Sequence, residues 1–62
     1  MKIYRIRIID QRGEVIGALF VSFASDADAI RYADTAVDEY DCERVEVWSD
    51  ENLIGASTQR PK

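Results

Sequence analysis

The chain has 62 residues, of which 47% are hydrophobic and 32% are charged, and its net charge at pH 7 is −4. This length and composition indicate one small globular domain, residues 1–62, and exclude a disordered chain. The chain has no histidine and one cysteine, Cys42. Histidine-based catalysis, an internal disulfide bond and a zinc site built on paired cysteines are therefore excluded.

The acidic residues are concentrated in one segment of the chain. Residues 25–41 contain six acids and one arginine, a net charge of −5, so the rest of the chain carries +1. This concentration argues against direct nucleic-acid binding by the segment.

The hydropathy pattern argues against a membrane protein. No apolar run approaches the ~20 residues that a membrane-spanning helix needs. The first residues, Met-Lys-Ile-Tyr-Arg, are typical of a strand and not of a signal peptide. We therefore expect a cytoplasmic protein with no membrane partner.

Residues 2–10 predict a strand, because they alternate strictly and are rich in β-branched and aromatic residues. One face of this strand carries Tyr4, Ile6 and Ile8, and the other carries Ile3, Arg5, Arg7 and Ile9. Residues 10–13 predict a tight turn, because Asp10 can bond its own backbone and Gly13 can adopt a positive φ.

Residues 14–24 predict a second strand that forms a hairpin with the first. Both of its faces are apolar: Val15, Leu19, Val21 and Phe23 lie on one, and Ile16, Ala18 and Phe20 on the other. Gly17 marks either a bulge or a point where another part of the chain approaches closely.

Residues 25–41 predict the only helix. Ser25 is a favourable N-cap, and Asp28 stands where a capping box has its acid. The helical spacing predicts that one face packs on the sheet; it consists of Ile30, Ala33, Val37 and Tyr40, flanked by Ala29 and Ala36.

After the helix, residues 42–49 alternate again and predict a third strand. A turn at residues 50–52 and a brief strand at residues 53–56 follow, and the polar residues 57–62 are expected to fray. The order is therefore ββαββ, an α+β fold. Placing the first strand beside the third gives a four-stranded antiparallel sheet in the order 2-1-3-4, with the helix on one face.

Four short patterns along the chain carry a resemblance to other proteins. They are Tyr4-Arg5-Ile6, a turn ending in Gly13, the passage Val21-x-Phe23-x-Ser25-Asp26-x-Asp28-Ala29, and Val45-Glu46-Val47-Trp48. With these patterns the chain resembles a group of short alphaproteobacterial proteins that have no assigned function. The resemblance implies the same ββαββ fold without implying an active site.

The alternation predicts a core between the helix and the sheet, with Ile6 at its centre. Its expected members are Tyr4, Ile6, Ile8, Val15, Leu19, Val21, Phe23, Ile30, Ala33, Val37, Tyr40, Val45 and Val47.

The opposite face of the sheet is the first candidate functional surface, because one helix covers only one face. The residues expected there are Ile3, Arg5, Arg7, Ile9, Ile16, Phe20 and Trp48, around Glu46. One interpretation is that the arginine side chains cover Phe20 and Trp48 and pair with Glu46. We favour the other interpretation, a homodimer interface, because aromatic residues and arginine are typical of interface hot spots.

The acidic face of the helix is the second candidate surface, made of Asp34, Asp38, Glu39 and Asp41. The simpler interpretation is a solvated face that favours solubility. The alternative function is an acidic inhibitor or nucleic-acid mimic that binds a basic protein partner through these residues.

We expect neither an enzyme nor a cofactor. The serines have no catalytic base at motif spacing, and no phosphate-binding loop occurs. Asp34, Asp38 and Asp41 share the spacing of one helix face, but a divalent cation prefers oxygen ligands that converge from several elements. We therefore expect no metal site.

Overall fold

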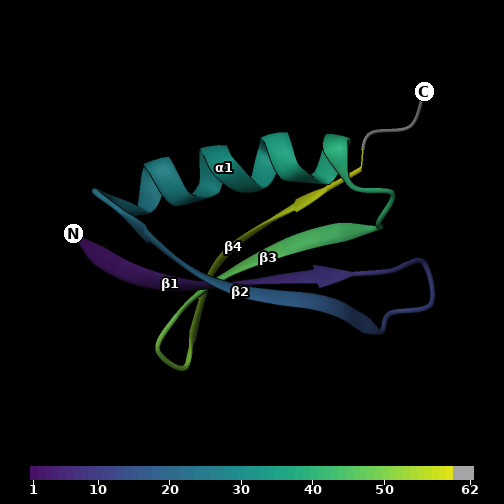
Figure 1. Ribbon diagram of the computed structural model, residues 1–62, viewed down its shortest axis with the longest axis horizontal. Coiled ribbons are helices and arrows are strands. Elements are labelled where there is room, and N and C mark those ends of the chain that lie inside the picture. The colour runs from purple at the N-terminus through teal and green to yellow at the C-terminus, as the bar shows by residue number, and fades with distance from the viewer. Residues whose placement is uncertain (60–62) are drawn as a thin grey trace.

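The computed structural model describes residues 1–59. Its elements in chain order are β1 (Lys2–Ile9), β2 (Val15–Phe23), α1 (Asp26–Glu39), β3 (Arg44–Ser49) and β4 (Asn52–Thr58). The strands form one antiparallel sheet in the order β2-β1-β3-β4, and α1 packs against one face of it (Figure 1). The predicted α+β fold, strand order and single helix are confirmed.

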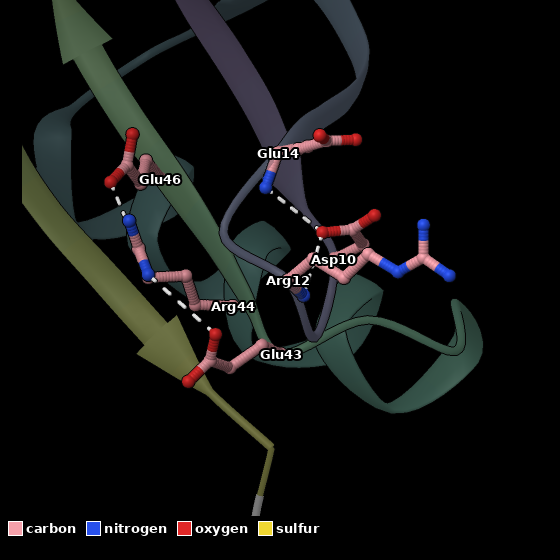
Figure 2. A network of polar contacts seen from close by, with 6 residues as sticks. All are labelled: Asp10, Arg12, Glu14, Glu43, Arg44 and Glu46. Atoms are coloured by element: carbon pink, nitrogen blue, oxygen red, sulfur yellow. Dashed lines mark hydrogen bonds and ion pairs between the residues drawn. The ribbon is translucent and has the colours of Figure 1, made fainter.

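The turn between β1 and β2 forms as the sequence predicts. The Oδ1 atom of Asp10 accepts hydrogen bonds from the backbone N–H groups of Arg12 and Glu14, both at 2.9 Å (Figure 2). Gly13 has a φ of 84°, which a residue with a Cβ rarely adopts. These contacts fix the hairpin and leave the Arg12 side chain exposed.

α1 begins as predicted but ends earlier. The Ser25 hydroxyl accepts from the backbone N–H of Asp28 at 3.3 Å, which confirms the N-cap. At the other end Tyr40 is already extended, and its N–H donates to the carbonyl of Ala36. Tyr40 is 44% exposed, so its predicted place in the core is wrong. The last turn has no basic residue to offset its acids, which favours an early end.

The core lies between α1 and the sheet. Its buried members are Tyr4, Ile6, Ile8, Ala29, Ala33, Ala36, Val37, Cys42, Val45 and Val47. The helix contributes mainly small residues, which let its backbone approach the sheet closely. Leu19, Val21 and Phe23 of β2 pack against this cluster but are only partly buried.

A β-bulge explains why Val15 is not in the core. Ile8 pairs with Gly17 and Ile9 pairs with Val15, so Ile16 is the extra residue in β2. An extra residue reverses which side chains share a face. Val15 consequently lies on the side of Ile9 and is exposed, and its predicted place in the core is wrong.

β4 is longer than the brief strand expected at residues 53–56. It continues to Thr58, and the backbone N–H of Gln59 donates to the carbonyl of Glu43. Ser57 is buried, and its hydroxyl donates to the carboxylate of Asp34 on α1. Fraying was therefore wrongly predicted for residues 57 and 58, and residues 60–62 lie outside the described part of the chain.

The helix does not cover the sheet evenly. It lies mainly over β3 and β4 and has few contacts with β1 and β2 (Figure 1). A Cβ on Gly55 of β4 would lie 3.2 Å from the Cδ1 atom of Ile30, so the helix sits tightly on this strand. The other edge of the sheet, β2, is left less protected.

Candidate interaction surface

The sheet face that α1 does not cover is termed the open face. Its residues, placed by strand register, are Ile3, Arg5, Arg7, Ile9, Val15, Ala18, Phe20, Ser22, Arg44, Glu46, Trp48, Leu53, Ala56 and Thr58. The register brings Arg5 of β1 between Phe20 of β2 and Trp48 of β3. The register thus places the predicted residues Ile3, Arg5, Arg7, Ile9, Phe20 and Trp48 on this face, and Ile16 lies in the bulge beside it.

Large apolar side chains of this region are open to solvent. Phe20 is 75% exposed, Ile3 65% and the bulge residue Ile16 58%. Leu53 of β4 is also exposed and pairs with Trp48. Sequence reasoning missed Leu53, because a second irregularity between Val47 and Trp48 hides the alternation of β4.

Ile9 does not belong to the exposed surface. It is 2% exposed, and the register places it between Val15 on β2 and Arg44 on β3. Ile9 therefore lies on the predicted face but is covered, and its role in an interface stays a prediction. The parity of β1 predicts the face, whereas the burial depends on the neighbouring strands and on the bulge in β2.

Trp48 is covered by the two arginines of β1. The Cζ atoms of Arg5 and Arg7 lie 5.6 and 5.7 Å from the centre of its ring. Such cation–π contacts contribute about 0.5–1 kcal/mol each at exposed sites. The arginines therefore cover Trp48, as one of the two interpretations proposed, whereas Phe20 stays exposed.

Glu46 is the acidic centre of the open face. Its carboxylate accepts from the indole Nε1–H of Trp48 at 3.1 Å and from the Nε–H of Arg44 at 3.0 Å. Arg44 extends between Glu46 and Glu43, whose Oε2 atom lies 3.9 Å from a guanidinium nitrogen (Figure 2). The ion-pair partner of Glu46 is thus Arg44, and neither Arg5 nor Arg7.

The pKa of Glu46 is the result of opposing effects. Burial alone would raise this pKa, but the hydrogen bonds from Trp48 and Arg44 and the charges of Arg44 and Arg7 outweigh it. The pKa consequently lies below its ordinary value of 4.5. A depressed carboxylate pKa means that the ionised form stabilises the folded state.

Glu46→Gln is expected to reduce the loss of stability in acid. In the wild type, the contribution of Glu46 is fully present above pH 4.5 and is lost as the pH falls through the lower folded pKa. The substituted glutamine side chain keeps an acceptor for Trp48 but cannot titrate. Urea unfolding, followed by Trp48 fluorescence at pH values from 7 to 2, measures the free energy of unfolding of both proteins. If both proteins lose the same unfolding free energy in acid, the lowered pKa of Glu46 is contradicted.

A hollow of about 280 Å³ opens on this surface, lined by Ile3, Arg5, Phe20 and Asp50. Asp50 begins the β3–β4 turn with a φ of 56°, a left-handed conformation in which aspartate is enriched among the non-glycine residues. The Nε atom of Arg5 is buried and has no hydrogen-bond partner in residues 1–59. The hollow therefore combines an apolar wall with one cationic and one anionic side chain.

The four acids of the second candidate surface do not form one helix face. Asp34 accepts the bond from Ser57, and Asp41 follows the helix in the turn toward β3. Asp38, Glu39 and Asp41 are exposed, and no ion pair within residues 1–59 involves them. Docking of a basic partner here stays a prediction.

No group of acids, cysteines or histidines in the described part of the chain is arranged to hold a metal ion.

Cys42 is a buried thiol two residues before the start of β3. Burial, and to a smaller extent the charge of Asp41, raise the pKa of this thiol above its ordinary value of 9.0. A thiol that stays protonated is a poor nucleophile.

In residues 1–59, α1 is too short and too polar to cross a membrane. Comparisons with family models, with curated proteins and with solved structures found no match to this chain. The resemblance to alphaproteobacterial proteins and the cytoplasmic location therefore stay predictions.

Proposed function

We propose that the protein is a small non-enzymatic interaction module that forms a homodimer through its open face. The observation that carries this proposal is the exposure of Phe20 and Ile3 on neighbouring strands of the sheet. Solvent-exposed apolar patches of this kind typically mark protein–protein contacts. Their position beside Arg5 and Trp48 gives the surface the composition of an interface centre.

The hollow makes the surface complementary to itself. In a homodimer with two-fold symmetry, both copies use the same patch, so a protruding group must find its receptor on that patch. Phe20 protrudes beside a hollow lined by Ile3. The hollow also holds Arg5 and Asp50, so two copies that share it bring the cationic side chain of one close to the anionic side chain of the other.

The size of the open face limits the strength of this dimer. Four strands of about eight residues, spaced about 4.8 Å apart, cover roughly 500 Å². A standard interface buries about 800 Å² on each partner. We therefore expect a dimer that forms at high protein concentration and dissociates on dilution.

Ile3→Asp is expected to weaken self-association, because it places a charge in the apolar patch beside the hollow. Ala27→Asp adds the same charge on an exposed position of α1 and is the matched control. Sedimentation velocity over a dilution series measures the average mass against the 7.1 kDa of one chain. We expect a concentration-dependent mass for the wild type and the control, and a lower mass for Ile3→Asp at every concentration. A wild-type chain that stays monomeric at the highest concentration would overturn the proposal.

A further inference from the structure

The edge strand β2 lacks most of the features that usually prevent edge-to-edge pairing, and its one irregularity, the bulge at Ile16, lies near the start of the strand. Its nine residues include no charged residue and no proline. As an edge strand it directs every second pair of backbone N–H and C=O groups away from β1. Lysine, proline or a covering element normally blocks such a row. β4, the opposite edge, carries Asn52, Ser57 and Thr58 and lies under the helix.

Both faces of β2 leave apolar side chains incompletely covered. On the helix side Leu19, Val21 and Phe23 are partly buried, because α1 lies mainly over β3 and β4. On the open face Phe20 and Ile16 are exposed. A partner that only stacked on the open face would leave the helix-side residues as they are. A strand added beside β2 covers residues on both faces at once.

We propose that β2 pairs antiparallel with β2 of a second copy, around a two-fold axis perpendicular to the sheet. The two sheets then form one continuous sheet of eight strands, with both helices on the same side. This is a second self-association surface, distinct from stacking through the open face. The two copies supply each other with the backbone partners and the apolar neighbours that β2 lacks.

The length of β2 selects the register of this pairing. When Leu19 faces Leu19 of the second copy, the two strands overlap over all nine residues, Val15–Phe23. A shift by one residue in each copy leaves two residues of each strand without a neighbour in the other copy. Each lost neighbour removes cross-strand contact, so the register centred on Leu19 is favoured.

Edge pairing also changes what the open face can do. Joining two sheets doubles their common open face from roughly 500 to roughly 1,000 Å², above the size of a standard interface on one partner. Two such joined sheets stacked through their open faces form a tetramer with dihedral symmetry. Edge pairing and face stacking are therefore compatible and strengthen each other.

Disulfide trapping tests the edge pairing and its register. In the proposed pair the two copies of residue 19 face each other, so Leu19→Cys is expected to form a cross-linked dimer under mild oxidation. Ser22→Cys is the matched control, because residue 22 lies opposite Ile16 and its two copies are about 20 Å apart. Wild-type protein, with only the buried Cys42, gives the background. Non-reducing electrophoresis measures the cross-linked fraction, and circular dichroism verifies that each variant folds.

The result also separates edge pairing from face stacking. Leu19 lies on the helix side of the sheet, so open-face stacking alone never brings two copies of residue 19 together. Cross-linking of Leu19→Cys well above the wild-type background supports the proposal, and cross-linking no higher than this background overturns it. Ser22 lies on the open face, opposite Ile3, so cross-linking of Ser22→Cys reports stacking and not edge pairing. The Ile3→Asp experiment addresses stacking independently, so the failure of one proposal is distinguishable from the failure of the other.

Hydrogen exchange of the unmodified protein gives a second measurement. The outward N–H groups of β2 exchange freely in a monomer and are bonded in the edge-paired state. Their exchange is expected to slow about tenfold when about 90% of the chains are paired. The N–H groups at the β4 edge are the internal control. Exchange at β2 that does not depend on protein concentration overturns the proposal.

Discussion

Ile6→Ala is expected to leave most of the isolated protein unfolded at 25 °C. Ile6 is 0% exposed and lies on an interior strand, paired with Leu19 on one side and Val47 on the other. Truncating a buried isoleucine costs about 2–5 kcal/mol, through lost burial and the cavity left behind. A domain of this size typically has only about 3–5 kcal/mol of stability in total.

Ile3→Ala is the matched comparison, because it truncates the same side chain on the same strand but on the open face. We expect it to fold normally at low concentration and to associate less. Circular dichroism melts of both variants at low and high protein concentration separate these effects. If Ile3→Ala unfolds the chain and Ile6→Ala does not, the energetic roles of the two sheet faces are reversed.

The parts of the fold that depend on local chemistry could be predicted from the sequence. The alternation of β1, the Asp10 turn and the Ser25 cap each involve residues close together in the chain. The strand order follows from these elements, because hairpins on both sides of one helix leave few ways to form an antiparallel sheet. The edge position of β2 follows from that order, and its lack of charge is visible in the sequence alone.

The irregularities could not be predicted from parity. One extra residue at Ile16 moves Val15 to the other face, and a second irregularity in β4 obscures the position of Leu53. Gly17 is the only local signal of the bulge in β2, because it lies next to the extra residue Ile16. The burial of Ile9 and the hollow beside Asp50 depend on side chains from several strands. Such contacts appear only after the strands are assembled.

The end of the helix depends on tertiary packing and not on periodicity. The apolar spacing continues to Tyr40, so periodicity alone extends the helix to this residue. The structure ends α1 at Glu39, because the chain must turn back to bring Cys42 under the helix and into the core. Burial of Cys42 therefore takes precedence over burial of Tyr40.

Tyr4→Ala is expected to destabilise the protein about as severely as Ile6→Ala. Tyr4 is fully buried, and its ring centre lies 5.8 Å from that of Phe23, which in turn lies 5.4 Å from that of Tyr32. This aromatic row connects β1, β2 and α1. Removing its first ring leaves a large cavity beneath the start of the helix. Chemical unfolding of the variant checks this expectation, and a midpoint close to that of the wild type would contradict it.

Tyr4→Phe keeps the ring and isolates the role of the hydroxyl, which donates to Oδ1 of Asp26 at 2.5 Å. This bond, followed by burial and the nearby acids, raises the pKa of Tyr4 from 10.0 to about 12. Below pH 10 the tyrosine is protonated in both states, so its contribution to stability is fully present. Between pH 10 and about 12 only the unfolded chain releases the proton, and stability falls. Unfolding midpoints from pH 8 to 12 should therefore decline more steeply for the wild type than for Tyr4→Phe. Equal slopes would show that the hydrogen bond from the Tyr4 hydroxyl to Asp26 does not raise the pKa of Tyr4.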